Sequence, residues 1–321
     1  MGKEVFRWAF LGAGNIAHTT AEELKKSGKG EVVSVWNRTE SKAISFAKQF
    51  GCKAYPTPLE AISDPAVQGV YIAVNADRHA EFMKLCIKAH KPVLCEKPFT
   101  VNRKEAIEVF SLAEKEGVYV SEAMWTWHNK IANQVKKWID EGKIGKILEA
   151  KGSFSWPVLL FNKNPRLTEN SMIGGSLMDL GVYPIAYAYR LFGMPKGISC
   201  QGQIKNEVDL HDSILLSYPS FFVKLKAGFN RMDGEYFKIK GSKGSINVPL
   251  FHMAKKAILS GEKKEKIQDD SYLYAVQFEN VGKEILLGEK ESGFVPKQMT
   301  IDVMGILDEC RRQMKVVYPG E

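Results

Sequence analysis

The stretch FLGAGNIA, from Phe10 to Ala17, decides the fold of the first part of this sequence. The apolar run before it predicts a buried strand, and the residues after it predict a helix. Gly12 permits the tight turn between them, Gly14 lets the backbone approach a ligand closely, and Ala17 keeps the helix near the strand. Since a helix N-terminus offers unpaired N–H groups and a positive dipole end, this turn predicts a dinucleotide site rather than a plain glycine turn.

The residues that follow alternate between short apolar strands and helices, punctuated by glycine and proline. Such alternation predicts an α/β domain with a parallel sheet covered by helices on both faces. We expect this first domain to span residues 1–122. Its predicted strands are 5–11, 32–36, 70–74, 92–95 and 118–121, and its predicted helices are 15–27, 40–50, 79–90 and 104–116, with a short helix after Pro58.

The pattern changes beyond residue 122, where strand-like runs bounded by Gly, Pro, Asn and Asp dominate. We expect residues 123–321 to form an α+β domain with a mostly antiparallel sheet. The last predicted helix, 297–315, is a candidate to pack back on the first domain. The other predicted elements are strands at 147–154, 199–204, 213–218, 222–229 and 236–240, and helices at 130–141 and 175–191.

The composition is that of a globular protein, with 45% hydrophobic and 26% charged residues. The five cysteines are dispersed and form no CxxC pair, so neither a disulfide framework nor a metal cluster is expected. The N-terminus lacks an apolar signal core, and no apolar run reaches the length of a membrane-spanning helix. We therefore expect a cytoplasmic protein.

The formal net charge of +8 raises the question of an anionic partner. The densest basic run, residues 261–266, interleaves glutamates and lacks aromatic neighbours, which is typical of a solvated turn. The charge distribution therefore favours a small anionic ligand, such as a dinucleotide, over a nucleic acid.

The end of the second predicted strand bears on the choice of nicotinamide cofactor. About twenty residues past the glycine turn, an NAD-selecting site places an Asp or Glu on the ribose hydroxyls. Asn37 stands there instead, with Arg38 beside it and Lys42 close by. A guanidinium suits a 2′-phosphate, so the sequence favours NADP over NAD, unless Arg38 stacks on adenine or faces solvent.

Four motifs occur together in this chain: GAGNIA in the glycine turn, NR after the second predicted strand, CEKP at residues 95–98 and GGSLMDLGVYP at residues 174–184. Together they resemble the glucose–fructose oxidoreductase/inositol dehydrogenase (Gfo/Idh/MocA) family of NAD(P)-dependent sugar and polyol oxidoreductases. Tyr183, where many members carry histidine, makes the chain most similar to the dimeric dihydrodiol dehydrogenase branch. The resemblance covers essentially the whole chain. It implies a Rossmann domain followed by an α+β domain whose open sheet often mediates dimerisation.

The resemblance also implies that Lys97, the lysine of the EKP motif, is catalytic. Lys97 follows a predicted parallel strand, where open α/β sheets bind their ligands, and Pro98 restricts its backbone. Asp179 and Tyr183 are four residues apart on a predicted helix, and this face suits proton transfer if it looks into the cofactor cleft. The alternatives are a solvated lysine and a tyrosine that is hydrogen-bonded between helices.

Further candidates follow the other predicted strands. The family commonly carries Thr-Pro where Ala73-Val74 stand here, and often a proline at the position of Asn129. His79 is equally suited to capping a helix, and Trp125 to packing in a core. The expected cofactor-binding residues are Gly12, Gly14, Asn15, Ile16, Asn37, Arg38, Lys42, Asn75, His79 and Glu96, and the expected substrate-binding residues are Trp125, His128 and Arg166.

We expect reversible hydride transfer between nicotinamide C4 and a secondary alcohol or carbonyl carbon of a sugar, polyol or dihydrodiol-type substrate. Tyr183 and Lys97 would manage the proton of the reacting oxygen, and Asp179 would orient or tune them. The expected partners are a small polar substrate and further copies of this chain, without nucleic acid or membrane. The alternative is a non-catalytic NAD(P)(H) sensor on the same fold, although a sensor has no need of three proton-transfer groups.

Overall fold

The computed structural model describes residues 5–162 and 164–321, which form two compact units. Unit 1 comprises residues up to 100, 104–128 and 271–300, and unit 2 comprises 101–103, 129–270 and 301–321. The chain passes from unit 1 to unit 2 between residues 128 and 129, and residues 271–300 return to unit 1. Residues 1–4 of the expected first domain lie outside the described residues.

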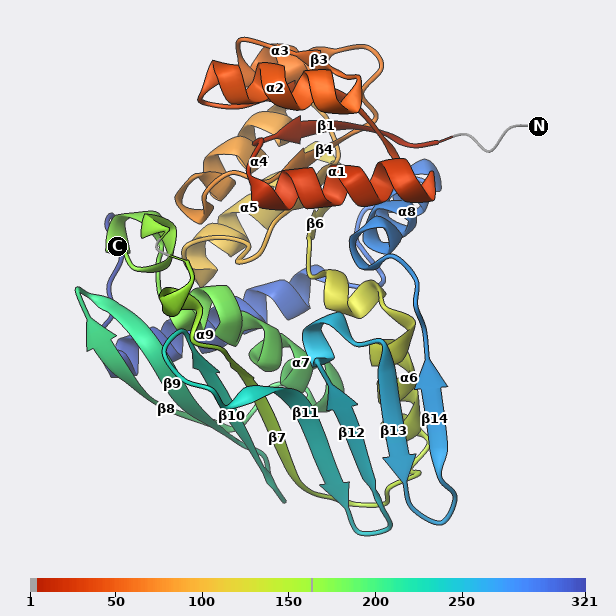
Figure 1. The fold of residues 1–321 in the computed structure, drawn as a ribbon, viewed down its shortest axis with the longest axis vertical. Coiled ribbons are helices and arrows are strands. Elements are labelled where there is room, and N and C mark those ends of the chain that lie inside the picture. The colour runs from red at the N-terminus through yellow and green to blue at the C-terminus, as the bar shows by residue number, and fades with distance from the viewer. Residues whose placement is uncertain (1–4, 163) are drawn as a thin grey trace. The chain divides into compact units, whose positions relative to one another are not determined.

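Unit 1 is built on six parallel strands in the order β3-β2-β1-β4-β5-β6, which confirms the predicted α/β class (Figure 1). The glycine turn joins the first strand to the first helix, as predicted. The strands are β1 (Arg7–Leu11), β2 (Glu31–Trp36), β3 (Lys53–Ala54), β4 (Gly69–Ile72), β5 (Val93–Cys95) and β6 (Val120–Glu122). The helices are α1 (Asn15–Ser27), α2 (Glu40–Phe50), α3 (Pro58–Ser63), α4 (His79–Lys88), α5 (Arg103–Glu116) and α8 (Leu273–Leu286).

Helix α8 was not predicted from the sequence, yet it completes the core of unit 1. Its Phe278 is fully buried, with ring centroids 5.0 Å from Trp8 and 4.9 Å from Tyr71. The side chain of Glu23, on α1, accepts the backbone N–H groups of Tyr274 and Ala275 at 2.8 and 3.1 Å. A carboxylate at a helix N-terminus satisfies unpaired donors and complements the helix dipole, so α1 fixes where α8 begins.

Unit 2 is built on eight strands in the order β14-β13-β12-β11-β7-β10-β9-β8. Only the β7–β10 pair is parallel in this sheet, which confirms the predicted mostly antiparallel class. The strands are β7 (Ile147–Ser155), β8 (Gly197–Lys205), β9 (Val208–Ser217), β10 (Phe222–Gly228), β11 (Gly234–Gly241), β12 (Ser245–Pro249), β13 (Lys256–Ser260) and β14 (Glu265–Gln268). The helices are α6 (Lys130–Asp140), α7 (Val182–Phe192) and α9 (Lys297–Met314).

The three strands β12, β13 and β14 were not predicted. The run at 261–266, expected to be a solvated turn, is a turn only in its first part, and Glu265 already belongs to β14. This edge strand reads Glu-Lys-Ile-Gln, with one apolar residue in four positions, so it carries no alternation that would distinguish it from a turn. The helix predicted over 175–191 also differs, because a π-helical turn, Leu177–Gly181, precedes α7.

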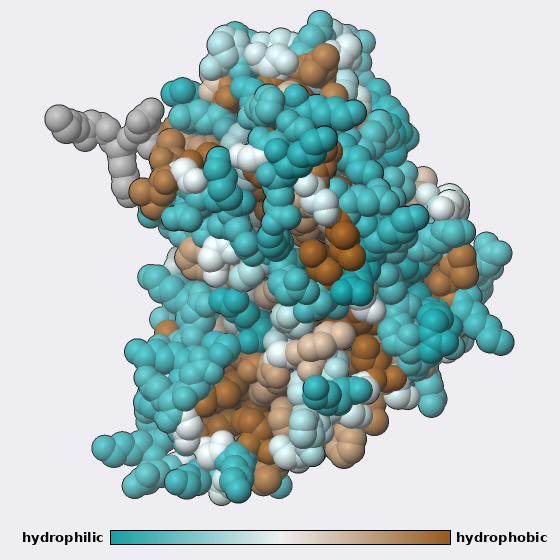
Figure 2. Space-filling view, turned by 180° about the vertical axis from the view of Figure 1, so that it is seen from behind, coloured by the Kyte–Doolittle hydropathy of each residue, from teal (hydrophilic) through white to brown (hydrophobic). Residues whose placement is uncertain are grey.

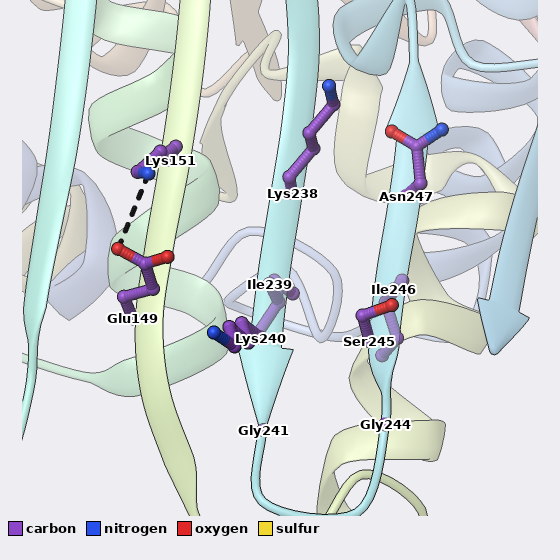
Figure 3. A pocket seen from close by; sticks show the side chains of 10 residues that line it. All are labelled: Glu149, Lys151, Lys238, Ile239, Lys240, Gly241, Gly244, Ser245, Ile246 and Asn247. Atoms are coloured by element: carbon purple, nitrogen blue, oxygen red, sulfur yellow. Dashed lines mark ion pairs between the residues drawn. The ribbon is translucent and has the colours of Figure 1, made fainter. Parts of the chain in front are cut away.

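One face of the unit 2 sheet packs against α7, and the other face is open. Lys151 on β7 stands directly opposite Lys224 on β10 and Lys238 on β11, so three lysines lie abreast on the open face. A shallow hollow of about 680 Å³ on this face, with its lining residues, is drawn in Figure 3, where Lys151 pairs with Glu149 at 3.4 Å. Like charges that face one another across strands destabilise a sheet unless they are screened or neutralised.

The molecular surface is mainly polar. On the face drawn in Figure 2, hydrophobic residues gather in separate patches among hydrophilic ones. Among the helices of the described residues, none combines the length and the apolar character needed to cross a membrane.

Two buried carboxyl groups lie at the ends of neighbouring strands in unit 1. Glu96 follows β5, is 6% exposed, and accepts the hydroxyl of Tyr71 at 2.6 Å and the backbone N–H of Lys97 at 3.2 Å. Glu122 ends β6, is 2% exposed, and accepts the hydroxyl of Thr300 at 2.9 Å. Burial, with a smaller contribution from the charge of Glu96, raises the pKa of Glu122 to about 7.

The raised pKa of Glu122 makes stability depend on pH. The folded protein holds this proton more tightly than the unfolded chain does. The stabilisation that results is therefore fully present below about pH 4 and is lost as the pH rises through 7. We expect the free energy of unfolding of Glu122→Gln, relative to the wild type, to rise by about 3 kcal/mol between pH 4 and 8. Urea denaturation across this range measures it. Exposed Glu22→Gln is the control, and a difference independent of pH would contradict the assignment.

Candidate functional site

The glycine turn of unit 1 is open where a ligand would approach it. Gly12 has φ +112°, and a Cβ atom there would lie 2.3 Å from the carbonyl oxygen of Ala73, so only glycine fits. Gly14 caps α1, and a Cβ atom there would meet nothing within 4 Å. Ala17 is fully buried against the sheet. The turn therefore combines a close backbone contact on one side with free space at a helix N-terminus on the other.

A cavity of about 360 Å³ adjoins this turn. It lies beside the ends of β1, β2 and β4, which is where open α/β sheets bind their ligands. Arg38, Lys42 and Arg78 supply cations to it, and Asp77 is the carboxylate among the lining residues. The lining residues are Ala13, Gly14, Trp36, Asn37, Arg38, Thr39, Lys42, Ala73, Val74, Asn75, Asp77, Arg78 and Phe82.

Asn37 joins two of the loops that line this cavity. Its Oδ1 atom accepts the backbone N–H of Ala13 at 3.1 Å, and its Nδ2 atom donates to the carbonyl of Thr39 at 3.0 Å. The amide thus fixes the position where an NAD-selecting enzyme carries a carboxylate. The next residue, Arg38, is exposed and projects from a backbone that Asn37 holds in place.

Arg78, Trp36 and Phe82 form a wall of the cavity that was not predicted. The rings of Trp36 and Phe82 are 5.2 Å apart, and the Arg78 guanidinium lies 5.5 Å from the centroid of Phe82. Glu81 binds the same guanidinium through both oxygens, at 2.6 and 2.7 Å. The signal was available in the sequence, because Arg78 stands three residues past Asn75 and therefore about one turn further along a helical segment.

His79 does not line the cavity, although it was expected to bind the cofactor. It is the first residue of α4 and is 1% exposed. Its Nδ1 atom lies 2.9 Å from the carbonyl of Pro98, and its Nε2 atom lies 3.2 Å from the carbonyl of Val74. Burial lowers the pKa of His79, which favours the neutral ring. The structure thus places His79 as a link between the loops that follow β4 and β5.

Lys97 stands at the carboxyl edge of the same sheet, directly after Glu96. Its side chain is half-buried, whereas Glu96 and Pro98 on either side are buried. Glu96 accepts the backbone N–H of Lys97, and the Lys97–Pro98 peptide is cis. The backbone under the lysine is therefore held by the sheet through Glu96 and by α4 through His79.

Trp125 and His128 lie in the core of unit 1. Both are 2% exposed, and both belong to a 3₁₀ turn, Trp125–His128. Trp125 contacts the ring of Tyr274 at 4.8 Å, and His128 stacks on Phe294 at 4.7 Å. These positions match core packing, which was the alternative for Trp125.

In unit 2, the motif from Gly174 to Pro184 forms the π-helical turn and the start of α7. Asp179 lies within the π-helical turn, and Tyr183 is the second residue of α7, 7% exposed. A π-helical turn inserts an extra residue into a helix, and such turns occur often at functional sites. The guanidinium nitrogens of Arg166 lie 3.2 and 3.3 Å from Oδ1 of Asp179. Unit 2 therefore brings together Arg166 and Asp179, which were predicted in different roles.

Two unpredicted side chains lie beside the ring of Tyr183, and a third holds one of them. Phe154 lies 5.7 Å from it and His252 lies 5.2 Å from it, between ring centroids. Glu235 is buried and holds His252, with 2.5 Å between Oε1 and Nδ1. These residues come from β7, the 3₁₀ turn at 251–253 and β11, so no local sequence pattern links them to Tyr183. The structure thus places a carboxylate–imidazole pair beside the phenol.

Comparison with known proteins agrees with this architecture. Residues 6–124 match the oxidoreductase family with an NAD-binding Rossmann fold, and residues 132–247 match the GFO/IDH/MocA C-terminal domain. Similar curated proteins include the trans-1,2-dihydrobenzene-1,2-diol dehydrogenases of Mus musculus, 31% identical, and Homo sapiens, 27% identical, each aligned over 98% of both chains. The predicted resemblance to the dihydrodiol dehydrogenase branch is thereby confirmed.

Solved structures share the fold. A 3-ketoreductase from Actinomadura kijaniata, in complex with NADP and TDP-benzene, superposes with a TM-score of 0.85 at 22% identity, over 97% of this chain and 98% of that one. An aldose-aldose oxidoreductase from Caulobacter crescentus also gives 0.85, at 18% identity over 97% and 98%. With both units matched along the chain, this protein belongs to the Gfo/Idh/MocA family of oxidoreductases.

Proposed function

We propose that this protein is an NADP(H)-dependent dehydrogenase that acts on a secondary alcohol or its carbonyl counterpart. The observation that carries the proposal is the cavity at the glycine turn, where Arg38, Lys42 and a helix N-terminus face one lining carboxylate, Asp77, and the third cation, Arg78, is paired with Glu81. This donor set fits a dinucleotide with several phosphates. When bound, the cofactor supplies the hydride chemistry, and the chain binds, orients and handles the proton.

The cavity residues would contact the pyrophosphate and the adenosine half of such a cofactor. The N–H groups that open α1, next to Gly14, suit a pyrophosphate because they are unpaired donors at the positive end of the helix dipole. Arg38 and Lys42 suit a 2′-phosphate, and Asn37 holds the loop that carries Arg38. Trp36 and Phe82 offer ring faces on which an adenine can stack.

The proton of the reacting oxygen is proposed to be handled by Lys97 and Tyr183. A half-buried ammonium donates strong hydrogen bonds to a carbonyl or alkoxide oxygen, and a phenol gives or accepts a proton. Asp179 is held by Arg166, and the Tyr183 ring is held by Phe154 and His252, so both side chains are oriented by their neighbours. Tyr183 is then the proton carrier and Lys97 the electrostatic partner of the oxygen.

The substrate class is proposed from the relatives. The curated relatives are named for a trans-dihydrodiol of benzene, and similar folds serve a 3-ketoreductase and an aldose-aldose oxidoreductase. These names refer to a diol, a ketone and aldoses, so each concerns a carbon that bears a hydroxyl or carbonyl oxygen. We therefore propose a vicinal diol, as found in dihydrodiols, sugars and polyols, as the feature that this enzyme recognises.

Replacing Arg38 with Ala tests the choice of cofactor. Loss of a charge-assisted hydrogen bond costs about 1.5–3 kcal/mol, so the Kd for NADPH should rise by about 10- to 100-fold while the Kd for NADH stays nearly constant. Fluorescence titration of the nicotinamide measures both constants. Lys48→Ala, an exposed cation on the helix that follows Arg38 but outside the cavity, is the control. A wild type that prefers NADH would refute the NADP assignment.

Replacing Lys97 with Met and Tyr183 with Phe tests the chemistry. Each change should lower kcat by about 10²- to 10⁴-fold, because general acid–base groups contribute rate factors of this size. NADPH binding should persist in both variants. Turnover is followed by NADPH absorbance on a panel of a trans-dihydrodiol, aldoses and polyols. The controls are Lys104→Met and Tyr272→Phe, both exposed. Tight NADPH binding without wild-type turnover on any substrate would favour the sensor function instead.

We also propose that the chain forms a homodimer through the open face of the unit 2 sheet. This face carries exposed Phe222 together with the row of Lys151, Lys224 and Lys238. Two such rows repel one another when the faces meet, and salt screens that repulsion. The dimer dissociation constant should therefore fall as NaCl rises from 20 to 300 mM, and less steeply in Lys224→Gln. Sedimentation equilibrium measures this, and a monomer at every salt concentration would exclude the dimer.

A further inference from the structure

Unit 2 contains a fully buried cluster of polar side chains directly before the π-helical turn. Ser176 and Asp209 are 0% exposed, and Asp212 is 1% exposed. Both aspartates belong to β9, and Ser176 is the residue that caps the π-helical turn. Ser176 lies three residues before Asp179 and seven before Tyr183 along the chain. The cluster is therefore placed to control where that helical segment begins.

The distances in this cluster require a proton on one of the carboxyl groups. The Oγ atom of Ser176 lies 2.9 Å from Oδ2 of Asp209 and 2.6 Å from Oδ2 of Asp212. A serine hydroxyl has one hydrogen, so it can donate to only one of these oxygens. The other short contact is a hydrogen bond only if the carboxyl group itself brings the hydrogen.

The backbone decides which aspartate carries that proton. Oδ2 of Asp209 also accepts the N–H of Leu177, at 2.6 Å, so this oxygen already acts as an acceptor. A carboxylate that accepts two hydrogen bonds is stabilised in its ionised form. The proton therefore belongs to Asp212, which donates to Ser176, and Ser176 donates to Asp209. The resulting chain of donors runs from β9 through Ser176 to the carboxylate that holds the first N–H of the π-helical turn.

Glycine backbone approaches both carboxyl groups closely. A Cβ atom at Gly175 would lie 2.3 Å from Oδ1 of Asp209, and one at Gly202 would lie 2.8 Å from Oδ1 of Asp212. Neither Oδ1 atom has a hydrogen-bond partner among the described residues. The titratable and charged groups near the pair are His211 on β9, Cys200 on β8, Cys310 and Arg311 on α9, and Tyr318.

Arg311, a buried cation in this region, is engaged elsewhere. Arg311 binds Glu321 at 2.6 and 2.9 Å and Asp308 at 2.8 Å, and it stacks on the ring of Tyr318. Burial and the charge of Asp209 raise the pKa of Asp212 well above its usual range. These effects agree with the proton that the distances place on Asp212.

We propose that Asp212, Ser176 and Asp209 are positioning residues that share one proton and thereby fix the start of the helical segment carrying Asp179 and Tyr183. The inference rests on the proposed function for its catalytic consequence. Ionisation of Asp212 would place two carboxylates on one hydroxyl, and the repulsion would release Ser176 and the turn that follows it. The pair then keeps the segment in place only while the proton is present.

Three variants separate this role from a general packing role. In Asp212→Asn the amide donates to Ser176 as the protonated acid does, so the segment should stay in place. Asp212→Ala and Ser176→Ala remove the donor chain and should loosen it. Hydrogen exchange followed by mass spectrometry should show faster exchange of residues 177–192 in both alanine variants and wild-type exchange in Asp212→Asn. Peptides from α1, in unit 1, serve as the internal control and should not change.

The pH dependence of stability tests the shared proton without any substrate. Because the pKa of Asp212 is raised in the folded state, the wild type should lose stability relative to Asp212→Asn as the pH rises above about 4. One proton corresponds to a factor of about 10 per pH unit in the ratio of folded to unfolded protein. Urea denaturation between pH 5 and 9 measures the ratio. An identical pH profile in the two proteins would overturn the shared proton.

Kinetics test the positioning role. With a substrate that the wild type turns over, Ser176→Ala should lower kcat by at least about 10-fold with NADPH affinity unchanged. Asp212→Asn should keep the wild-type kcat, and its kcat should fall less at alkaline pH than the kcat of the wild type. If the wild type turns over no substrate, the proposed function fails, whereas hydrogen exchange and urea denaturation still decide the inference. Equal exchange of residues 177–192 in all variants would overturn it.

Discussion

A contact between two backbones determines where unit 1 can hold a ligand. Because a Cβ atom at Gly12 would lie 2.3 Å from the carbonyl oxygen of Ala73, the ends of β1 and β4 can meet only through glycine. The N–H of Gly12 also donates to the carbonyl of Trp36 at 2.8 Å, which brings in the end of β2. Three strand ends thus converge without side chains between them, and the cavity with Arg38 and Lys42 opens beside that point. Every feature of the proposed cofactor site depends on this convergence.

Buried carboxyl groups hold the backbone beside the proposed catalytic residues in both units. Glu96 accepts the N–H of Lys97, and Asp209 accepts the N–H of Leu177, shortly before Asp179 and Tyr183. Each carboxyl group has a second acid close by, Glu122 in one unit and Asp212 in the other. A buried acid that keeps its proton avoids the cost of a second buried charge and still donates a hydrogen bond. Such a pair holds the backbone in place while it puts one negative charge, and not two, into the core.

The fold and the local motifs could be predicted from the sequence, and contacts distant along the chain could not. The glycine turn, α1 and α2 follow from spacing alone, and both fold classes are confirmed. Helix α8 escaped prediction because its role is to fill a core built some 200 residues earlier in the chain. His252 and Glu235 escaped because the unit 2 sheet brings His252 to Tyr183 and Glu235 to His252. Arg78 is different, because its position three residues after Asn75 indicates that it lies about one helical turn further on, beside the same cavity.

Unit 1 is assembled from a discontinuous chain, and this affects the order in which its core can form. Trp8, Phe10 and Tyr71 are made early, yet the ring of Phe278 that covers them belongs to a segment near the other end of the chain. On a ribosome these aromatic rings stay incompletely covered until residues 273–286 have been synthesised, and all of unit 2's sheet emerges in the meantime. Exposed aromatic clusters of this kind are binding sites for chaperones and starting points for aggregation. The return of α8 to the first unit thus makes the synthesis of residues 273–286 a condition for closing the nucleotide-binding fold.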